Sequence, residues 1–193
     1  VAACADSSEG IKSQQNTIDA LKEISKLSEA QVARFILVNN DISGTEIDTL
    51  KKYTAINGKV ADTIHRYFDE YNTSRLGNLD QQDRINVLKL PGVHSFASFN
   101  PDGETDSPFI LPEGARVRGI TGEIPEGSAD TIDKIVTTLG IQADDRTIGY
   151  FEASANTYPI LHFGGFANLK KVTERYQNKI SQIQARSSQA DKN

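Results

Sequence analysis

Apolar residues recur at helical spacing over the first forty positions of the chain. Gly10 and Gly44 enclose a stretch that contains neither glycine nor proline. Apolar positions three and four residues apart in such a stretch are typical of an amphipathic helix. The pattern predicts a helix over 8–40, with a candidate break at 28–31, where Ser-Glu-Ala-Gln reads as a capping box.

A second periodic stretch follows the polar turn at 41–44, with Thr45 as its candidate N-cap. Its spacing alternates between three and four residues, which predicts a seam against another helix. The seam consists of Ile47, Leu50, Thr54, Asn57, Ala61, Ile64, Phe68 and Tyr71. Two helices joined by a short turn predict a long antiparallel hairpin, whose arms could each reach about 40 Å.

The pattern changes near Pro91. A short helix over 80–90, capped by Asp80, is expected to stop at Pro91-Gly92, and residues 93–99 alternate as a strand does. Further strands are expected at 109–111 and 115–120, a helix from Ser128 to Gly140, and a two-stranded hairpin formed by 147–153 and 158–163. In that hairpin Ile148 would face Phe163.

Together these elements predict an α+β, mainly helical fold. It would consist of a long antiparallel helical hairpin plus a C-terminal helix, with an inserted small mixed α/β unit. The predicted segments are a tether at 1–10, the helical hairpin and short helix at 11–92, the small α/β unit at 93–165, a C-terminal helix at 166–186 that packs on the helical body, and a frayed tail at 187–193.

Composition and charge exclude some classes of protein. The 193 residues are 37% hydrophobic and 24% charged, which suits a globular chain with one sizeable core. A net charge of −5 argues against nucleic-acid binding. The longest apolar run, Phe35 to Val38, is far shorter than the roughly 20 residues of a transmembrane helix. Residues 101–160 hold 11 acids and 4 bases, whereas 161–193 hold 2 acids and 6 bases, so intramolecular complementarity is expected.

Cys4 is the only cysteine, so no intrachain disulfide is expected. The first residues, Val1-Ala2-Ala3-Cys4, resemble the lipobox of bacterial lipoproteins, and the polar stretch 5–10 resembles the tether that follows one. The resemblance implies that Cys4 is a lipid anchor. Ala5 after the cysteine implies sorting to the outer membrane, on its periplasmic face. A mature lipoprotein would begin at the cysteine, and a chance cysteine in a frayed terminus is the alternative.

Candidate chemistry is sparse, and no catalytic residue, metal site or cofactor is predicted. His94 and His162 fall on expected strands, where they could meet and bind a metal with an acid. In the expected register His162 instead faces Gly149, which favours packing. Arg116 and Arg118 share a strand face and are expected to pair with acids or to clamp a ligand carboxylate. These two pairs are the candidate ligand-binding residues.

The leading hypothesis is therefore a non-enzymatic lipoprotein of the cell envelope that binds another protein. Its contact with the membrane would run through the lipid on Cys4. The first alternative is an enzyme or a small-ligand-binding protein with its site in 93–165. The second is a subunit of an assembly that associates through the seam at 47–71.

Overall fold

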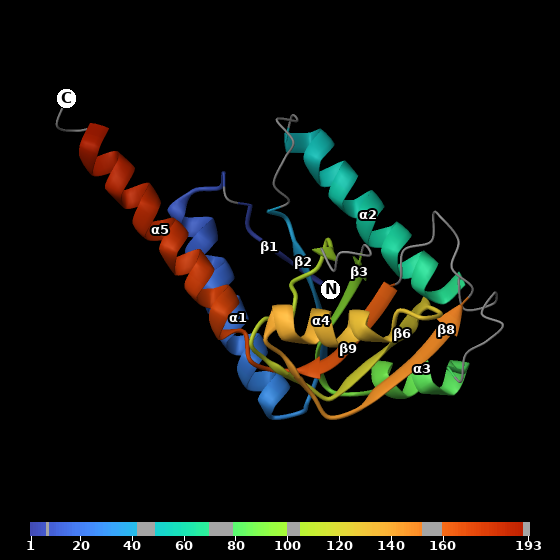
Figure 1. Cartoon of the computed structure of the whole chain (residues 1–193). Helices are drawn as coiled ribbons and strands as arrows, with labels where there is room; N and C mark the ends of the chain where they lie inside the picture. Colours follow the sequence, from blue (N-terminus) through green and yellow to red (C-terminus); the bar gives the residue numbers. More distant parts are fainter. Residues whose placement is uncertain (7, 42–48, 70–78, 100–104, 152–159, 191–193) are drawn as a thin grey trace.

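The structure is a computed structural model of the whole chain (Figure 1). It describes residues 1–6, 8–41, 49–69, 79–99, 105–151 and 160–190. The elements in chain order are β1 (Ala2–Cys4), α1 (Ile11–Glu29), β2 (Arg34–Asn39), α2 (Thr49–Asp69), α3 (Gln81–Leu88), β3 (Gly92–Phe99), β4 (Thr105–Asp106), β5 (Arg116–Val117), β6 (Gly119–Pro125), α4 (Ala129–Leu139), β7 (Gln142–Ala143), β8 (Arg146–Phe151), β9 (Ile160–Phe166) and α5 (Lys170–Ala190).

A mixed sheet organises the chain. Its main path has the order β1-β2-β3-β9-β6-β8, and β4 pairs with β3 beside this path. β1, β2 and β3 are parallel, β9 lies antiparallel between β3 and β6, and β8 is parallel to β6. Each face of the sheet carries its own apolar core. One core includes residues of α1, α4 and α5, and the other includes residues of α2, so the sheet lies between two helical layers (Figure 1).

The predicted long helical hairpin is wrong. Helix α1 ends at Glu29, and residues 34–39 form strand β2, which lies between β1 and β3 in the sheet. The chain leaves α1 through Gln31, whose φ of 59° is left-handed. Glycine usually occupies such a position, so Gln31 carries no local signal that the helix ends there. The apolar run Phe35–Val38 is a parallel strand, which is buried on both faces and therefore lacks alternation.

The seam predicted on the second helix is also wrong. Helix α2 packs against β3 and β9 of its own sheet. Its buried or half-buried apolar and aromatic side chains in the described part are Tyr53, Ile56, Val60, Ile64 and Tyr67. Of the predicted seam positions, Thr54, Asn57 and Ala61 are exposed, and Phe68 is 42% exposed. Ile64 belongs to both sets, while Ile47 and Tyr71 lie outside the described residues.

The strand pairing near the C-terminus differs from the expected hairpin. β8 and β9 are not neighbours, because β6 lies between them. Phe163 faces Ile120, and His162 faces Thr121 rather than Gly149. A hairpin joins two strands that follow each other in sequence, whereas here β6, which precedes both, lies between β8 and β9. Pairing of this non-local kind leaves no trace in the local pattern.

Several local predictions are confirmed. The alternating stretch after Pro91 is β3. Asp80 caps α3, with a reciprocal hydrogen bond to Asp83 that completes a capping box. Gly140 ends α4 in the left-handed conformation. In the part of the chain that the structure describes, no helix is both long and apolar enough to span a bilayer.

Candidate functional site

Strands β1 and β2 end side by side, because Cys4 lies opposite Asn39 in their parallel pairing. Ligands of open sheets with parallel strands bind in the crevice beyond the carboxyl ends of the strands. The residues that gather beyond β1 and β2 are therefore the first place to look for a site. We call this group the strand-end site; its members are Asp6, Glu9, Gln14, Asp41, Lys52, Tyr53, Tyr176 and Lys179.

The segment after β1 carries a buried carboxylate. Asp6 is 2% exposed and forms an ion pair with Lys52 of α2. The backbone N–H and the hydroxyl of Ser8 also donate to its Oδ1. Burial alone would raise the pKa of Asp6, but the hydrogen bonds from Lys52 and Ser8 outweigh it, so the pKa lies below its usual value. Asp6 is thus a fixed negative charge at neutral pH.

Side chains of helix α1 form hydrogen bonds with the backbone of the segment after β1. Gln14 is fully buried, and its side-chain N–H₂ donates to the backbone carbonyls of Asp6 and Glu9. The backbone N–H of Ala5 donates to Thr17 Oγ1 over 3.0 Å. Among the described residues, Gln14 Oε1 has no hydrogen-bond partner. A buried acceptor without a partner is costly, so this oxygen can accept a donor from a bound molecule or water.

Helix α2 brings an aromatic ring to the same place. Tyr53 is half-buried, and its hydroxyl donates to Glu9 Oε1 over 3.1 Å. The same Glu9 oxygen accepts the backbone N–H of Asp6 over 2.8 Å. Burial first, and then the hydrogen bond to Glu9, raise the pKa of Tyr53. Tyr53 therefore stays protonated and fixes the Glu9 carboxylate.

Helix α5 closes the other side of the strand ends. Tyr176 is 1% exposed and donates to the backbone carbonyl of Ala5 over 3.2 Å. Lys179 forms an ion pair with Asp41, just beyond β2, and lies 4.7 Å from the centre of the Tyr176 ring. Burial raises the pKa of Tyr176. The loops after both strands are thus each held by a helix from elsewhere in the chain.

Cys4, predicted as a lipid anchor, lies in β1 at the base of this site. Its side chain belongs to the core, and the residue is 4% exposed. Burial raises the pKa of its thiol to about 11. The cysteine is therefore a protonated core residue in this fold.

The structure brings the predicted ligand residues together in two separate pairs. His94 Nδ1 of β3 lies 2.9 Å from His162 Nε2 of the neighbouring strand β9, and both side chains are buried. Arg116 and Arg118 line a hollow of about 470 Å³ at the surface, where Arg116 pairs with Asp144 over 2.6 Å. The arginines are thus at the surface and the histidines are buried. Among the described residues, no three metal-ligating side chains gather in one place.

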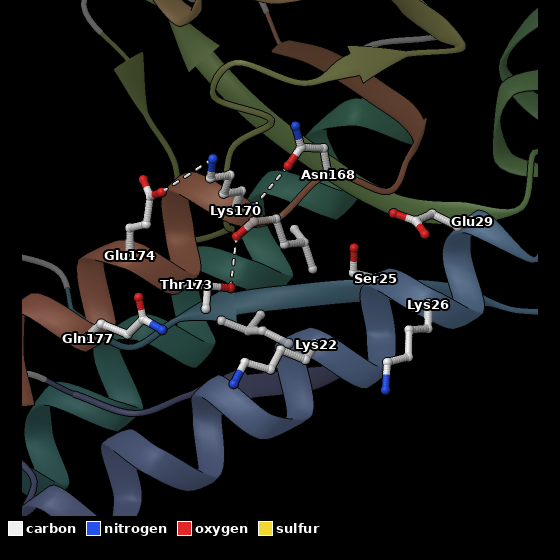
Figure 2. Close-up of a pocket in the computed structure, with 11 residues that line it drawn as sticks. Lys22, Ser25, Lys26, Glu29, Asn168, Lys170, Thr173, Glu174 and Gln177 are labelled. Carbon is white, nitrogen blue, oxygen red and sulfur yellow. Dashed lines mark hydrogen bonds and ion pairs between the residues drawn. The ribbon is translucent and has the colours of Figure 1, made fainter.

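A neighbouring hollow of about 500 Å³ lies between α1 and α5 (Figure 2). Its rim carries Lys22, Lys26 and Lys170. Each of these lysines has an acidic partner on its own helix, namely Asp19, Glu23 and Glu174. Exposed ion pairs between neighbours on one helix are common on protein surfaces, so these lysines do not by themselves indicate a ligand site.

Sequence reasoning missed the strand-end site. It assigned Glu9 to a tether and described Tyr53 as a residue of a helix that packs on another helix. The contact between them depends on β1 lying beside β2, and three-residue β1 carries too short a pattern to be recognised. Asp80 was recognised as the residue that caps a helix, because capping is a local signal.

No protein-family model and no curated protein matches the chain. Solved structures do. TubZ of Clostridium botulinum phage c-st aligns with a TM-score of 0.68 at 13% identity, over 95% of this chain and 60% of that one. Protofilaments of TubZ from Bacillus thuringiensis serovar israelensis in the GDP form align with a TM-score of 0.65 at 16% identity, over 98% of this chain and 56% of that one. CetZ2 from Haloferax volcanii, a protofilament bound to GTPγS, aligns with a TM-score of 0.56 at 16% identity, over 95% of this chain and 60% of that one.

These neighbours correct the predicted function. The envelope lipoprotein, its place on the periplasmic face of the outer membrane and the coiled-coil hairpin are all overturned, because the chain has the fold of filament proteins. The candidate ligand-binding residues in 93–165 stay a prediction. The chain spans about three-fifths of the length of the TubZ structures that it matches. Over that span it shares the TubZ fold.

Proposed function

We propose that this chain belongs to a filament-forming protein that binds a guanine nucleotide, and that the strand-end site contacts the nucleoside. The supporting observation is the fold, which is shared with TubZ and CetZ2 protofilaments in GDP and GTPγS forms. A nucleotide, when bound, would supply phosphate charge that differs between its two forms.

The residues beyond β1 and β2 suit a nucleoside. The half-exposed ring of Tyr53 offers a surface on which a purine can stack. Glu9 offers a carboxylate that can accept hydroxyl donors of a ribose. Asn57 lies one turn along α2 from Tyr53 and is exposed. Its amide can both donate to and accept from the edge of a base.

The charges near these residues are balanced within the protein. Lys52 neutralises Asp6, and Lys179 neutralises Asp41. The site therefore does not depend on phosphate to be stable, and the chain holds it ready before any ligand arrives. Preorganisation of this kind reduces the entropic cost of binding.

Nucleoside binding can be tested on the full chain by saturation-transfer NMR with GDP. Wild type should transfer saturation to the base and ribose protons, and Tyr53→Ala should weaken binding about tenfold or more, because stacking of one base is worth about 1–3 kcal/mol. Tyr53→Phe keeps the ring and is the matched control, expected to bind within a few-fold of wild type. Equal binding by wild type and Tyr53→Ala would contradict the assignment.

Self-association is the second part of the proposal. Pelleting and negative-stain electron microscopy of the full chain, at rising concentration with GTPγS, GDP or no nucleotide, are the measurements. We expect a critical concentration above which polymer appears, and we expect it to depend on the nucleotide, since nucleotide charge differs between the two forms. Sedimentation as a monomer at every concentration and with either nucleotide argues against a filament role.

A further inference from the structure

A chain of buried hydrogen bonds crosses the sheet from α2 to the turn between α3 and β3. The Tyr67 hydroxyl lies 2.7 Å from Thr121 Oγ1 and 3.5 Å from His162 Nδ1. His162 Nε2 lies 2.9 Å from His94 Nδ1, and His94 Nε2 lies 2.8 Å from the carbonyl oxygen of Leu90. Both histidines and Tyr67 are at least 97% buried. We call this set the histidine chain.

The direction of each hydrogen bond follows from its fixed end. The Leu90 carbonyl can only accept, so His94 carries its proton on Nε2 and offers a lone pair on Nδ1. His162 must then donate from Nε2, which leaves its own Nδ1 as an acceptor facing the Tyr67 hydroxyl. This assignment holds while both imidazoles are neutral, and it gives them the same tautomer. A proton added to His94 Nδ1 would force His162 to move its own proton from Nε2 to Nδ1, where it would face the Tyr67 hydroxyl.

Burial and two arginines oppose a proton on the histidines, whereas the Leu90 carbonyl favours one on His94. From α3, Arg84 lies 4.5 Å from the centre of the Tyr67 ring and forms an ion pair with Glu123 of β6. From β2, Arg34 repels a charge on His94. Burial first, and then His94 and Arg84, hold the pKa of His162 well below its usual value. Burial first, and then Arg34, lower the pKa of His94 despite its bond to Leu90.

Packing indicates that the histidine chain would open at Tyr67, by movement of this side chain away from His162. Tyr67 lies in the last turns of α2, edge-on to Phe96 and His162, and Phe96 is stacked on His162 with ring centres 4.4 Å apart. Phe68 beside it is 42% exposed, so solvent reaches this end of the helix. Tyr67 therefore covers His162 from the side of α2, and its departure would open that side of the ring.

We propose that the histidine chain is an acid-sensitive latch that holds the last turn of α2 on the sheet. The closed latch requires both histidines neutral, whereas in the open state each returns to a pKa of about 6.5. Above that pH the closed state is fully favoured. Below it the open state binds more protons, so the closed-to-open ratio falls by up to tenfold per pH unit for each histidine that protonates.

Hydrogen exchange of the full chain tests the latch. Amide protection of residues 64–68, corrected for the pH dependence of intrinsic exchange, should fall at least tenfold between pH 7.5 and 5.5. Protection of α1, which belongs to the core on the opposite face of the sheet, should change much less. Equal protection of 64–68 at both pH values overturns the proposal.

Two further measurements keep the test decisive. His65→Gln changes an exposed histidine on the same helix and should leave the pH dependence intact, whereas His162→Gln should remove the contribution of one of the two histidines and so weaken it. Should that variant fail to fold, ¹⁵N NMR of the wild-type imidazoles decides. Neutral Nε2–H signals that are lost only together with the protection of 64–68 support the latch. Titration of either histidine near pH 6.5 while α2 stays protected overturns it.

Discussion

Replacing Arg84 with methionine should lower the free energy of unfolding by about 3–5 kcal/mol, because it breaks a buried ion pair from one side. Arg84 is 3% exposed and Glu123 is 7% exposed, and their closest atoms lie 3.3 Å apart. The guanidinium also donates to the backbone carbonyl of Tyr67 over 2.6 Å, near the C-terminal end of α2. The substitution thus leaves Glu123 buried without this cation and removes a link between α3, α2 and β6.

Urea unfolding at pH 7 measures the effect, and two further variants interpret it. Arg116→Met breaks an ion pair whose arginine side chain is 73% exposed, so it should cost less than about 1 kcal/mol. Arg84→Met combined with Glu123→Leu removes both charges and should recover most of the loss, since the burial penalty of the lone carboxylate disappears. A single Arg84→Met variant as stable as Arg116→Met would contradict this account.

Arg84 also shows what the sequence could and could not reveal. Its helix, α3, was predicted correctly, because Asp80 at its start and Pro91-Gly92 after it are local signals. Its partner Glu123 lies on a strand that comes 31 residues after α3 ends, and no periodicity links the two. Burial of both charges follows only from the packing of α3 on β6.

The same distinction explains the error over the fold class. The stretch from Gly10 to Gly44 has no breaker, so a single helix was the simplest prediction. The structure breaks it with Gln31, a residue that seldom adopts a left-handed conformation. Once residues 34–39 form a strand, the helical hairpin disappears and the segment joins a mixed sheet instead. One unusual φ thus hid the strand that changes the predicted fold class.

The candidate site was harder to predict for a different reason. His94 and His162 were expected to lie on strands, and they do, but the expected register set His162 against Gly149, whereas the structure places it beside His94. Glu9 and Tyr53 come from a loop and a helix that are 44 residues apart. Their contact depends on two parallel strands ending at the same level, which is a property of the sheet and of neither segment.

The second large effect concerns the position where β3 begins. Gly92→Ala should destabilise the protein by about 3 kcal/mol or more, because Gly92 is buried with a φ of 115°, which other residues adopt only with about 1–3 kcal/mol of strain. An added Cβ would also lie 2.9 Å from the carbonyl oxygen of Phe166 and 3.1 Å from the carbonyl carbon of Gly165. Both contacts are backbone atoms of β9, so neither can move away without breaking the sheet.

The matched control is a glycine-to-alanine substitution at a position whose backbone conformation and surroundings accommodate a Cβ. Gly58 lies inside helix α2 with nothing within 4 Å of a built Cβ, so Gly58→Ala should raise stability by about 0.5–1 kcal/mol. Thermal unfolding of both variants beside wild type is the measurement, and the two shifts should have opposite signs. The contrast isolates the close approach of β3 to β9, where the register shifts between Val93 and His94. Equal shifts would mean that this approach does not govern the start of β3, and with it the placement of His94.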